Sequence, residues 1–600
     1  MIRINQLKLP VEHKPEELKK KAAKALRISP EQVEKLEIRR RSLDGRKKPE
    51  LFYSYTVDIK TAREEQVLHR AKNSQAAICQ EKPYVFPKPG EEMLFSPPII
   101  VGAGPAGLFA GLMLARAGYC PVILERGEDV DSRRKRVDEF WKTGKLDVRS
   151  NVQFGEGGAG TFSDGKLNTL VKDPLMRNRL VLEVFCEFGA DSSILYDSKP
   201  HIGTDVLSGI VKAMRQEIVR LGGHVRFGCQ VTELVTEGGQ IRGVRVRQQE
   251  GRPDDNMAEN ENQEREEFLS AQAVILAIGH SARDTFSMLE QKKIPMDAKS
   301  FAVGLRIQHP QSLINLSQYG RMDGGSLGAA SYKLTRQTST GRGVYSFCMC
   351  PGGYVVDASS EREHLAVNGM SYHARDGKNA NSALIVTVTP EDFPQPGPLG
   401  GVAFQRSLER LAFQAADGHI PVQLYEDYRA GRQSRQLGEI EPQMRGRWAF
   451  GNLREVMPEN LNLALLEAME GFGQMIRGFD RPDALFAGIE SRTSSPVRIW
   501  RNDEMESQVR GLYPCGEGAG YAGGITSAAM DGVKVALQFQ MIGCFTLPGA
   551  AVKQGGLSLA AVNTRSQQQA DFIDESGFKK ASVDIASTDN NQTFHIELFA

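Results

Sequence analysis

The sequence predicts an α/β protein built around a Rossmann-type parallel sheet, with an inserted α+β domain and a small α/β domain at the N-terminus. Three observations predict this fold. From about residue 97, apolar strand-like segments alternate with helical ones, which is typical of a parallel sheet with helices on its faces. The first of these segments runs into a glycine-rich turn, and a second strand, glycine turn and helix return near residue 511.

Composition excludes several other classes of protein. A hydrophobic content of 40% with 25% charged residues is ordinary for a globular protein, and a net charge of +1 gives no general attraction to nucleic acid or anionic membrane. Eight cysteines scattered along 600 residues argue against a disulfide scaffold and fit a reducing compartment. The N-terminal segment lacks a signal-peptide pattern, and the most apolar stretch, 97–119, is interrupted by glycines. We therefore expect a cytoplasmic protein without a membrane span.

The first 90 residues predict a small basic α/β domain. Residues 4–10 alternate like a strand, and residues 15–26 have helical spacing. Two further strand-like segments, 35–41 and 51–59, flank a turn-rich stretch. Residues 1–60 hold 16 Lys or Arg against 9 Asp or Glu.

The strongest motif follows the predicted strand 99–101 and reads Gly102-x-Gly104-x-x-Gly107 at the start of a predicted helix. Gly102 permits the tight turn, and Gly104 lets the backbone approach a pyrophosphate. Gly107 lets the helix pack close to the strand. Together they indicate a dinucleotide site.

Neighbouring residues fit the same site. Pro105 suits the first helical turn, where its missing N–H costs nothing, and the free N–H groups at the helix N-terminus attract phosphates. A second strand ends at Glu125, 23 residues after Gly102, where its carboxylate is placed to accept hydrogen bonds from the adenosine ribose hydroxyls.

The returning unit at 511–536 indicates which dinucleotide is bound. A strand ends near Cys515, a turn carries Glu517, and a helix starts near Gly524. A chain that returns with a second strand, turn and helix binds an elongated cofactor at both ends, which indicates FAD. Glu517 is placed to hold the ribityl hydroxyls. The helix N-terminus after Gly524 is placed beside the flavin N1 and C2 carbonyl, where negative charge develops on reduction.

These segments resemble a known superfamily. Residues 98–126 and 511–536 resemble the two FAD fingerprints of glutathione-reductase-type flavoproteins, and 273–286 are similar to the strand-and-glycine segment between them. Residues 151–167, NVQFGEGGAGTFSDGKL, resemble the glycine-rich loop that the fumarate-reductase branch lays along the pyrophosphate and flavin. With CMCPGG, SYHARDGKNANSA and SRTSSPVRI, the chain from about residue 1 to 545 resembles a bacterial family described as uncharacterised FAD-dependent dehydrogenases. One departure is Glu517, where the superfamily usually has Asp.

The motifs and the resemblance together give the residues that we expect to contact FAD. They are Gly102, Gly104, Pro105, Ala106, Gly107, Glu125, Arg126, Gly157, Gly158, Gly160, Val231, Gly279, Gly516, Glu517, Gly524 and Ile525.

The chain is expected to divide into five segments. They are the basic α/β domain at 1–90, which ends in a proline-rich linker at 81–92; the first part of the FAD-binding domain at 91–284, with an acidic insertion near 248–267; an α+β substrate or cap domain at 285–505; the closing part of the FAD-binding domain at 506–546; and a weakly ordered tail at 547–600.

Two cysteines in the middle region are candidate catalytic residues. Cys348 and Cys350 lie two apart, so on a strand their side chains face the same way. They form either a redox pair or two small apolar core residues. The region that carries the reactive cysteines in flavin disulfide reductases, 151–165 here, contains none, which argues against a dithiol reductase of that type. The cysteine spacing is unlike a structural zinc site, and we expect no metal.

The segment 371–383 is the second candidate for chemistry. It gathers His373 and Arg375 in a polar turn that either binds a carboxylate and donates a proton or only builds the turn. The same two interpretations stay open for His201, His280, Arg283 and Arg477.

We therefore expect an FAD-dependent oxidoreductase that acts on a small molecule held in the 285–505 domain. The sequence has no second strand–GxGxxG–helix unit for a nicotinamide, so NAD(P)H would bind only as a transient donor. Two alternatives stay open: a non-catalytic flavin redox sensor, and an RNA-associated flavoprotein that uses the basic N-terminal domain. Interleaved acidic residues argue against RNA. The sequence does not specify the substrate, the electron donor and acceptor, or the oligomeric state.

Overall fold

The structure is a computed structural model that describes residues 1–80, 84, 90, 92–249 and 264–545. Most of the predicted linker at 81–92, most of the acidic insertion and all of the tail at 547–600 therefore lie outside the described residues. No helix in the described part of the chain is long and apolar enough to cross a membrane.

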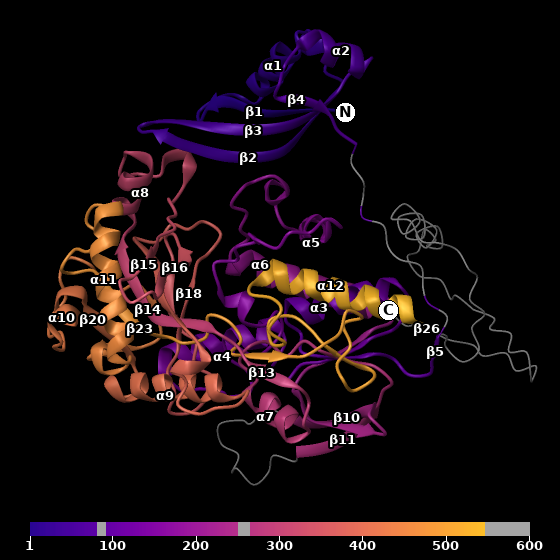
Figure 1. The fold of residues 1–600 in the computed structure, drawn as a ribbon, viewed down its shortest axis with the longest axis vertical. Coiled ribbons are helices and arrows are strands. Elements are labelled where there is room, and N and C mark those ends of the chain that lie inside the picture. The colour runs from indigo at the N-terminus through magenta and orange to yellow at the C-terminus, as the bar shows by residue number, and fades with distance from the viewer. Residues whose placement is uncertain (81–83, 85–89, 91, 250–263, 546–600) are drawn as a thin grey trace, which may run out of the picture.

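The N-terminal unit is a four-stranded antiparallel sheet with two helices on one side (Figure 1). The helix predicted at 15–26 is confirmed with the same bounds. The turn-rich stretch after residue 41 is mostly strand, because pairing between β2 and β3 continues to Lys47 and Glu50, with a register shift after Asp44. The elements are β1 (Ile2–Pro10), α1 (Pro15–Leu26), β2 (Lys35–Lys47), β3 (Glu50–Lys60), α2 (Glu64–Ala71) and β4 (Ala76–Ile78), with sheet order β2-β3-β1-β4.

The centre of the molecule is a five-stranded parallel sheet of order β25-β12-β6-β7-β8. It confirms the predicted Rossmann-type α/β fold. Helices cover it, and its strands β6, β12 and β25 are buried throughout because a parallel sheet has no solvent-facing side, whereas the edge strand β8 is partly exposed. The strands are β6 (Ile99–Val101), β7 (Val122–Leu124), β8 (His224–Arg226), β12 (Val274–Leu276) and β25 (Leu512–Pro514), and the helices are α3 (Pro105–Arg116), α4 (Val130–Thr143), α5 (Arg177–Glu187), α6 (Thr204–Arg220) and α12 (Ile525–Ile542).

Smaller sheets flank this unit. An antiparallel sheet carries the acidic insertion between its last two strands, and two short two-stranded sheets join distant parts of the chain. Phe286, Leu289 and Met296 pack in one cluster with Ile99, although the predicted boundary at 284/285 assigns them to the second domain. The elements are β9 (Cys229–Glu237), β10 (Gln240–Gln249) and β11 (Glu264–Ser270), with α7 (Arg283–Gln291), β13 (Met296–Ala298) paired to β24 (Val497–Ile499), and β5 (Glu92–Leu94) paired to β26 (Gly543–Phe545).

The inserted α+β region is built on a seven-stranded mixed sheet of order β15-β16-β19-β14-β23-β20-β22. Its strands β14 and β19 are buried along nearly their whole length, under helices that bury their apolar faces on it. The strands are β14 (Phe301–Pro310), β15 (Thr335–Gln337), β16 (Gly343–Cys350), β19 (Asn379–Val388), β20 (Ile420–Leu424), β22 (Trp448–Phe450) and β23 (Leu485–Glu490); a three-stranded sheet adds β17 (Tyr354–Asp357), β18 (Val367–Met370) and β21 (Met444–Arg445); the helices are α8 (Gln311–Tyr319), α9 (Gly400–Ala415), α10 (Tyr425–Ala430) and α11 (Glu459–Met475).

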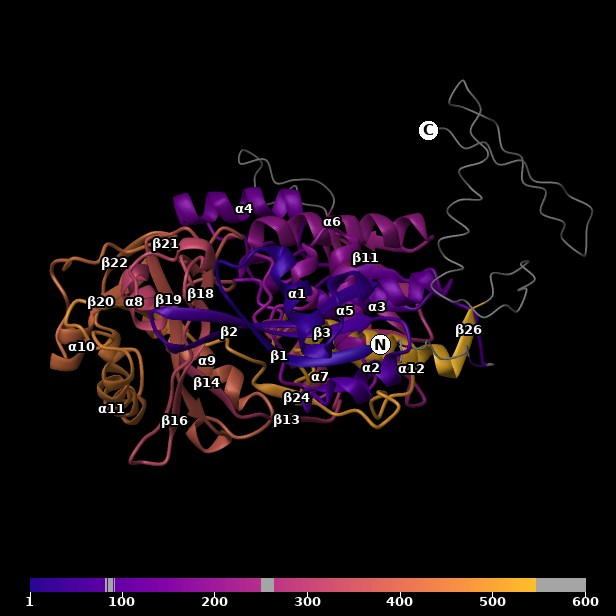
Figure 2. The same cartoon turned by 90° about the horizontal axis from the view of Figure 1, so that it is seen from above.

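In both views the seven-stranded sheet lies to one side of α3 and α12 (Figures 1 and 2). In Figure 1 the N-terminal sheet lies above both of these parts. The N-terminal unit docks through the edge of β2. The N–H of Arg41 donates to the carbonyl oxygen of Tyr196 at 2.7 Å, and the N–H of Ser198 donates to that of Arg41 at 2.9 Å. The guanidinium of Arg41 also binds both carboxylate oxygens of Asp197, at 2.6 and 2.8 Å. The docked segment leads directly into Lys199 and His201.

Candidate functional site

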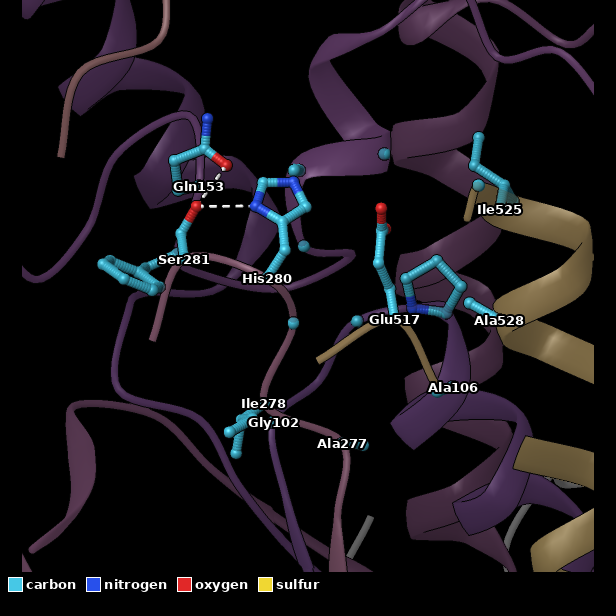
Figure 3. A pocket seen from close by; sticks show the side chains of 18 of the residues that line it. Gly102, Ala106, Gln153, Ala277, Ile278, His280, Ser281, Glu517, Ile525 and Ala528 are labelled. Atoms are coloured by element: carbon cyan, nitrogen blue, oxygen red, sulfur yellow. Dashed lines mark hydrogen bonds between the residues drawn. The ribbon is translucent and has the colours of Figure 1, made fainter. Parts of the chain in front are cut away.

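A groove of about 320 Å³ opens at the carboxyl ends of β6, β7 and β12, where the N-termini of α3 and α12 also meet (Figure 3). In open parallel sheets, ligands bind beyond the carboxyl ends of the strands, at the point where chain connections diverge to either side. Here β6 lies between β7 and β12, so the groove is at such a point. Residues of β9 and of the seven-stranded sheet also line it, so one groove joins three parts of the fold.

Most of the residues expected to contact FAD line this groove, and three do not. The lining includes Gly102, Gly104, Pro105, Ala106, Glu125, Arg126, Gly158, Gly160, Val231, Gly279, Glu517, Gly524 and Ile525. Gly107, Gly157 and Gly516 are not among the lining residues, and their expected contact with FAD stays a prediction.

Contacts with other protein atoms explain why these three positions are glycine. A Cβ at Gly107 would lie 1.9 Å from the carbonyl oxygen of Gly102, and one at Gly157 would lie 2.1 Å from Oγ1 of Thr161. A Cβ at Gly516 would lie 2.7 Å from the Cβ of Ala106. Their glycines therefore allow the turns to pack on α3 and on each other, rather than allowing a ligand to approach.

Gly104 and Gly523 show the opposite pattern. Both line the groove, and neither has a positive φ that would demand glycine. A Cβ at Gly104 would meet only the Cα of Gly158, at 3.8 Å, and one at Gly523 would meet nothing within 4 Å. The protein itself therefore leaves room for a side chain at both positions, and that room lies in the groove. Because these two positions near helix N-termini have no side chain, a ligand that carries phosphates and a flavin ring can approach the backbone closely there.

The Glu125 carboxylate links separate segments of the groove wall through hydrogen bonds. Its two carboxylate oxygens accept hydrogen bonds from the N–H groups of Ala103, Gly127 and Gly155, at 2.8, 2.9 and 3.0 Å. Sequence reasoning predicted a contact with ribose hydroxyls; the structure shows that this carboxylate also holds the glycine-rich turn against the 151–167 loop. Arg126 beside it stacks on the Phe154 ring at 4.4 Å.

Glu517 points its carboxyl group into the groove, on the side where Ile525 and Ala528 of α12 lie (Figure 3). Burial raises the pKa of this carboxyl to about 7, against the lowering effects of Lys299 and of the Gly524 N–H. The group therefore changes its charge near neutral pH.

His280, Ser281 and Gln153 form a chain of hydrogen bonds in the groove wall (Figure 3). The Nε2 of Gln153 donates to the Ala358 carbonyl at 3.1 Å, so its Oε1 faces Ser281, also at 3.1 Å. Arg492 Nη1 donates to Ser281 Oγ at 3.3 Å. All groups are satisfied when the Ser281 hydroxyl donates to Gln153 and His280 Nδ1–H donates to Ser281. We assign that tautomer, which leaves His280 Nε2 as an acceptor.

His280 is held neutral by its surroundings. Burial, and then the positive charges of Arg492 and Arg283, lower its pKa to about 3. The imidazole therefore accepts hydrogen bonds in the groove across the physiological range and does not add positive charge there.

The arginines behind His280 share one buried carboxylate. Glu409 binds Arg283 at 2.7 and 2.9 Å and Arg492 at 2.7 and 2.8 Å. Its side chain is fully buried, and although burial acts to raise its pKa, the two guanidinium groups hold that pKa far below the ordinary value. Because Glu409 belongs to α9, these ion pairs hold Arg492, which lines the groove, against that helix.

A second buried network lies under the part of the groove next to the seven-stranded sheet. Arg306 of β14 forms an ion pair with Glu490 of β23 and donates to Oδ1 of Asn381 at 2.9 Å and of Asn368 at 3.0 Å. Its Nη1 also donates to the Cys348 carbonyl at 2.9 Å. The network therefore positions three lining residues, Asn368, Cys348 and Glu490, from three different strands.

The two candidate cysteines do not face the same way. Cys348 has a φ of +43°, and the pairing of β16 with β19 shifts between Phe347 and Cys350, so strand alternation breaks there. Only Cys348 lines the groove, and both residues are free thiols. Burial raises the pKa of Cys348 and raises that of Cys350 to about 12, which disfavours reactive thiolates. This geometry favours the core interpretation over a redox pair.

His373 and Arg375 lie outside the groove. His373 is exposed, stacks on His201 at 5.3 Å and hydrogen bonds through Nδ1 to the Ile202 carbonyl at 2.9 Å. Arg375 forms an ion pair with Asp164, whose carboxylate lines the groove. Neither residue is among those that line the groove, which argues against contact with a ligand there, and their expected catalytic role stays a prediction.

Sequence reasoning missed several lining side chains. Lys166, Asp164 and Gln153 belong to the 151–167 segment that was singled out for its glycines alone. Asn368 and Glu490 lie in no segment that the sequence analysis quotes, and Arg492 lies in SRTSSPVRI, which is quoted only for the resemblance; their place beside the groove is what reveals them. In the part of the chain that the structure describes, no group of three or more His, Cys, Asp or Glu could hold a metal ion.

Comparison with known proteins places the chain in a family. It is 47% identical over 540 residues to a Clostridium beijerinckii protein described as an uncharacterized protein. The match covers 89% of this chain and 98% of that one. The chain belongs to that protein's family. Residues 300–493 match the family described as "FAD-dependent protein, C-terminal domain-like", and residues 1–60 match a domain of unknown function.

Solved structures show only distant likeness. A point mutant of the E. coli quinol fumarate reductase FrdA is 13% identical, with a TM-score of 0.31, and the match covers 81% of this chain and 76% of that one. The glycerol-3-phosphate dehydrogenase of Bacillus halodurans complexed with FAD is 10% identical, with a TM-score of 0.25, and the match covers 50% of this chain and 48% of that one. Identities this low say nothing about substrate. The family that residues 300–493 match is described as FAD-dependent, and FAD is the cofactor of this protein.

Proposed function

We propose that this protein uses FAD held in the groove to oxidise or reduce a small molecule that binds beside the seven-stranded sheet. The observation that carries the proposal is the composition of the groove. Bare glycine turns and two helix N-termini line it together with the anchored polar side chains Asn368, Glu490 and Arg492 of the inserted region. A dinucleotide needs the first set, and a second, smaller ligand needs the other.

The residues divide into holding and orienting groups. Gly104 and Pro105 at α3 would hold the pyrophosphate, and Gly524 and Ile525 at α12 would lie beside the flavin pyrimidine ring, each at the positive end of a helix. The flavin, when bound, supplies the hydride or electron chemistry. His280 Nε2 accepts a hydrogen bond, and the buried networks of Arg306 and Arg492 keep the opposite wall rigid and dry.

Glu517 gives a pH test of the ribityl contact. An ionised carboxylate accepts hydrogen bonds from ribityl hydroxyls, so we expect FAD affinity to rise as pH increases through about 7, where this carboxyl loses its proton. Because its folded pKa lies above the ordinary 4.5, ionisation opposes folding, and the FAD-free protein should lose stability as pH rises from about 4.5 to about 7, with no further loss from this group above that. Fluorescence titration of apoprotein with FAD across this range measures the effect. In Glu517→Gln the slope should vanish; an unchanged slope would assign it to another group.

Anaerobic rapid mixing tests the proposed reaction. The FAD-loaded protein is mixed with NADH, NADPH and a panel of small organic donors, and loss of flavin absorbance is followed. We expect at least one donor to bleach the flavin on the timescale of enzyme turnover, with dithionite as the positive control. If dithionite alone reduces the flavin, the proposal fails in favour of a redox sensor.

No observation favours RNA binding. Several basic residues of the N-terminal sheet are engaged in ion pairs: Arg3 and Arg39 with Asp58, Lys8 with Asp44, and Arg41 with Asp197. Side chains neutralised in this way offer phosphates little net charge.

A further inference from the structure

Two hydrogen-bond donors in the groove are left unused by the described protein. Lys166 lines the groove, and among the described residues its Nζ has no hydrogen-bond acceptor; a carboxylate oxygen of Asp164 lies 3.6 Å away. Asn368 also lines the groove. Its Oδ1 accepts from Arg306 at 3.0 Å and from the Gly369 N–H at 2.8 Å. Both partners are donors, so the amide orientation is fixed, and its Nδ2 has no partner in the described chain.

The two donors belong to one end of the groove. Arg306, which holds Asn368, also donates to the carbonyl oxygen of Cys348. Lys166 is the charged group that most strongly opposes the effect of burial on the Cys348 thiol, whose pKa burial raises. Lys166 and Asn368 therefore line the same groove as Cys348 on β16, to which Asn368 is joined through Arg306.

This end of the groove carries an excess of positive charge. Asp164 is the shared carboxylate of Arg375 and Lys166, and the ammonium of Lys199 lies close enough for both cations to lower its pKa, after the effect of burial. The pKa of the His201 imidazole is lowered too, to about 4, first by burial and then by the positive charge of Arg375. Lys166, Arg375 and Lys199 therefore outnumber the one carboxylate, that of Asp164, with which two of them pair.

The neighbouring ion pairs do not offset this excess. Arg306 is matched by Glu490, and Glu409 is shared by Arg283 and Arg492. The phosphates of FAD do not account for it either, because the expected pyrophosphate position lies at Gly104 and Pro105, against Gly158, and not beside β16.

We propose that Lys166 Nζ and Asn368 Nδ2 form a subsite for a carboxylate, and that the substrate of this flavin site is a small organic acid. The second half rests on the proposed oxidoreductase function; the first half does not. A lysine ammonium gives one carboxylate oxygen a charge-assisted hydrogen bond, and the fixed amide gives a directional one. The anchoring of Asn368 through Arg306 sets the direction before any ligand arrives.

Calorimetric titration of the FAD-loaded protein with malonate tests the subsite, with malonamide as the uncharged probe of the same size. We expect malonate to bind and malonamide to bind at least about tenfold more weakly. Lys166→Met should weaken malonate binding about ten- to hundredfold, and Lys166→Arg should restore most of it. Asn368→Asp, which keeps the acceptor for Arg306 but loses the donor, should weaken it as well.

Lys172→Met is the matched control, because Lys172 is exposed and does not line the groove; it should bind malonate as the unmodified protein does. Equal binding of malonate and malonamide, or unchanged affinity in Lys166→Met, would overturn the subsite. So would loss of FAD from Lys166→Met, seen in the flavin absorbance, since the lysine would then serve the cofactor. If the binding pattern holds while no donor reduces the flavin, the subsite stands and the oxidoreductase function fails.

Discussion

Replacing Gly104 by alanine is expected to abolish FAD retention while leaving the fold intact. The new Cβ would meet only the Cα of Gly158, at 3.8 Å, so the protein has room for it. A pyrophosphate that contacts the backbone here must occupy the same space as the added methyl group. We expect FAD affinity to fall by a factor of about a hundred or more, equivalent to about 2.7 kcal/mol. The ratio of flavin to protein absorbance after gel filtration measures it, together with the thermal midpoint of the apoprotein.

Gly107→Ala is the matched comparison, because it adds the same methyl group three residues along α3. There the Cβ would lie 1.9 Å from the Gly102 carbonyl oxygen, so the turn and helix must separate. We expect destabilisation of about 3 kcal/mol or more, and a lowered thermal midpoint even without cofactor. If Gly104→Ala retained FAD, or if it unfolded as Gly107→Ala does, the assignment of the bare backbone to the ligand would be wrong.

Replacing Glu409 by glutamine is expected to produce a large loss of stability. The carboxylate is fully buried and is the shared partner of Arg283 and Arg492, which are themselves buried. Glutamine keeps the shape but leaves two guanidinium groups with too little counter-charge, a situation that costs about 3–5 kcal/mol. Denaturant unfolding followed by fluorescence and circular dichroism measures the change. FAD affinity should fall too, since Arg492 and Ser281 lose their fixed positions.

The pH dependence gives a second readout for Glu409. Its folded pKa lies well below its unfolded value, so the stability it contributes is present above about pH 4.5 and is lost as pH falls toward the folded pKa. Glu409→Gln should therefore remove part of the acid sensitivity. Glu233→Gln is the surface control: this partly exposed carboxylate pairs with Arg245 at 3.1 Å, and its loss should cost at most about 1 kcal/mol. Equal effects of the two changes would contradict the buried role.

Local sequence signals predicted the nucleotide-binding unit well. The strand at 99–101 and the helix that starts at Pro105 have the expected bounds, because glycine spacing and the proline act within a few residues. The same signals did not separate glycines that face a ligand from glycines that face protein. Gly107, Gly157 and Gly516 differ from Gly104 only in their neighbours across the fold, which spacing does not encode.

The candidate site residues of the inserted region were harder to predict from the sequence. A left-handed residue at Cys348 breaks the strand alternation from which a paired orientation was expected. His373 and Arg375 lie in a polar turn whose composition favoured a site, whereas Asn368 and Lys166, which do line the groove, were not among the expected site residues. The Glu409 network joins residues 126 and 83 positions apart. No periodicity connects such positions, so only the assembled sheets bring them together.

The most direct measurement of the central claim is the absorbance spectrum of the purified full-length protein, followed by chromatography of the small molecule released on denaturation. A groove that joins two glycine turns and two helix N-termini predicts a yellow protein that releases FAD in a ratio of about one per chain, and that takes FAD up again after stripping. A colourless protein that gains no flavin spectrum when titrated with FAD would contradict it.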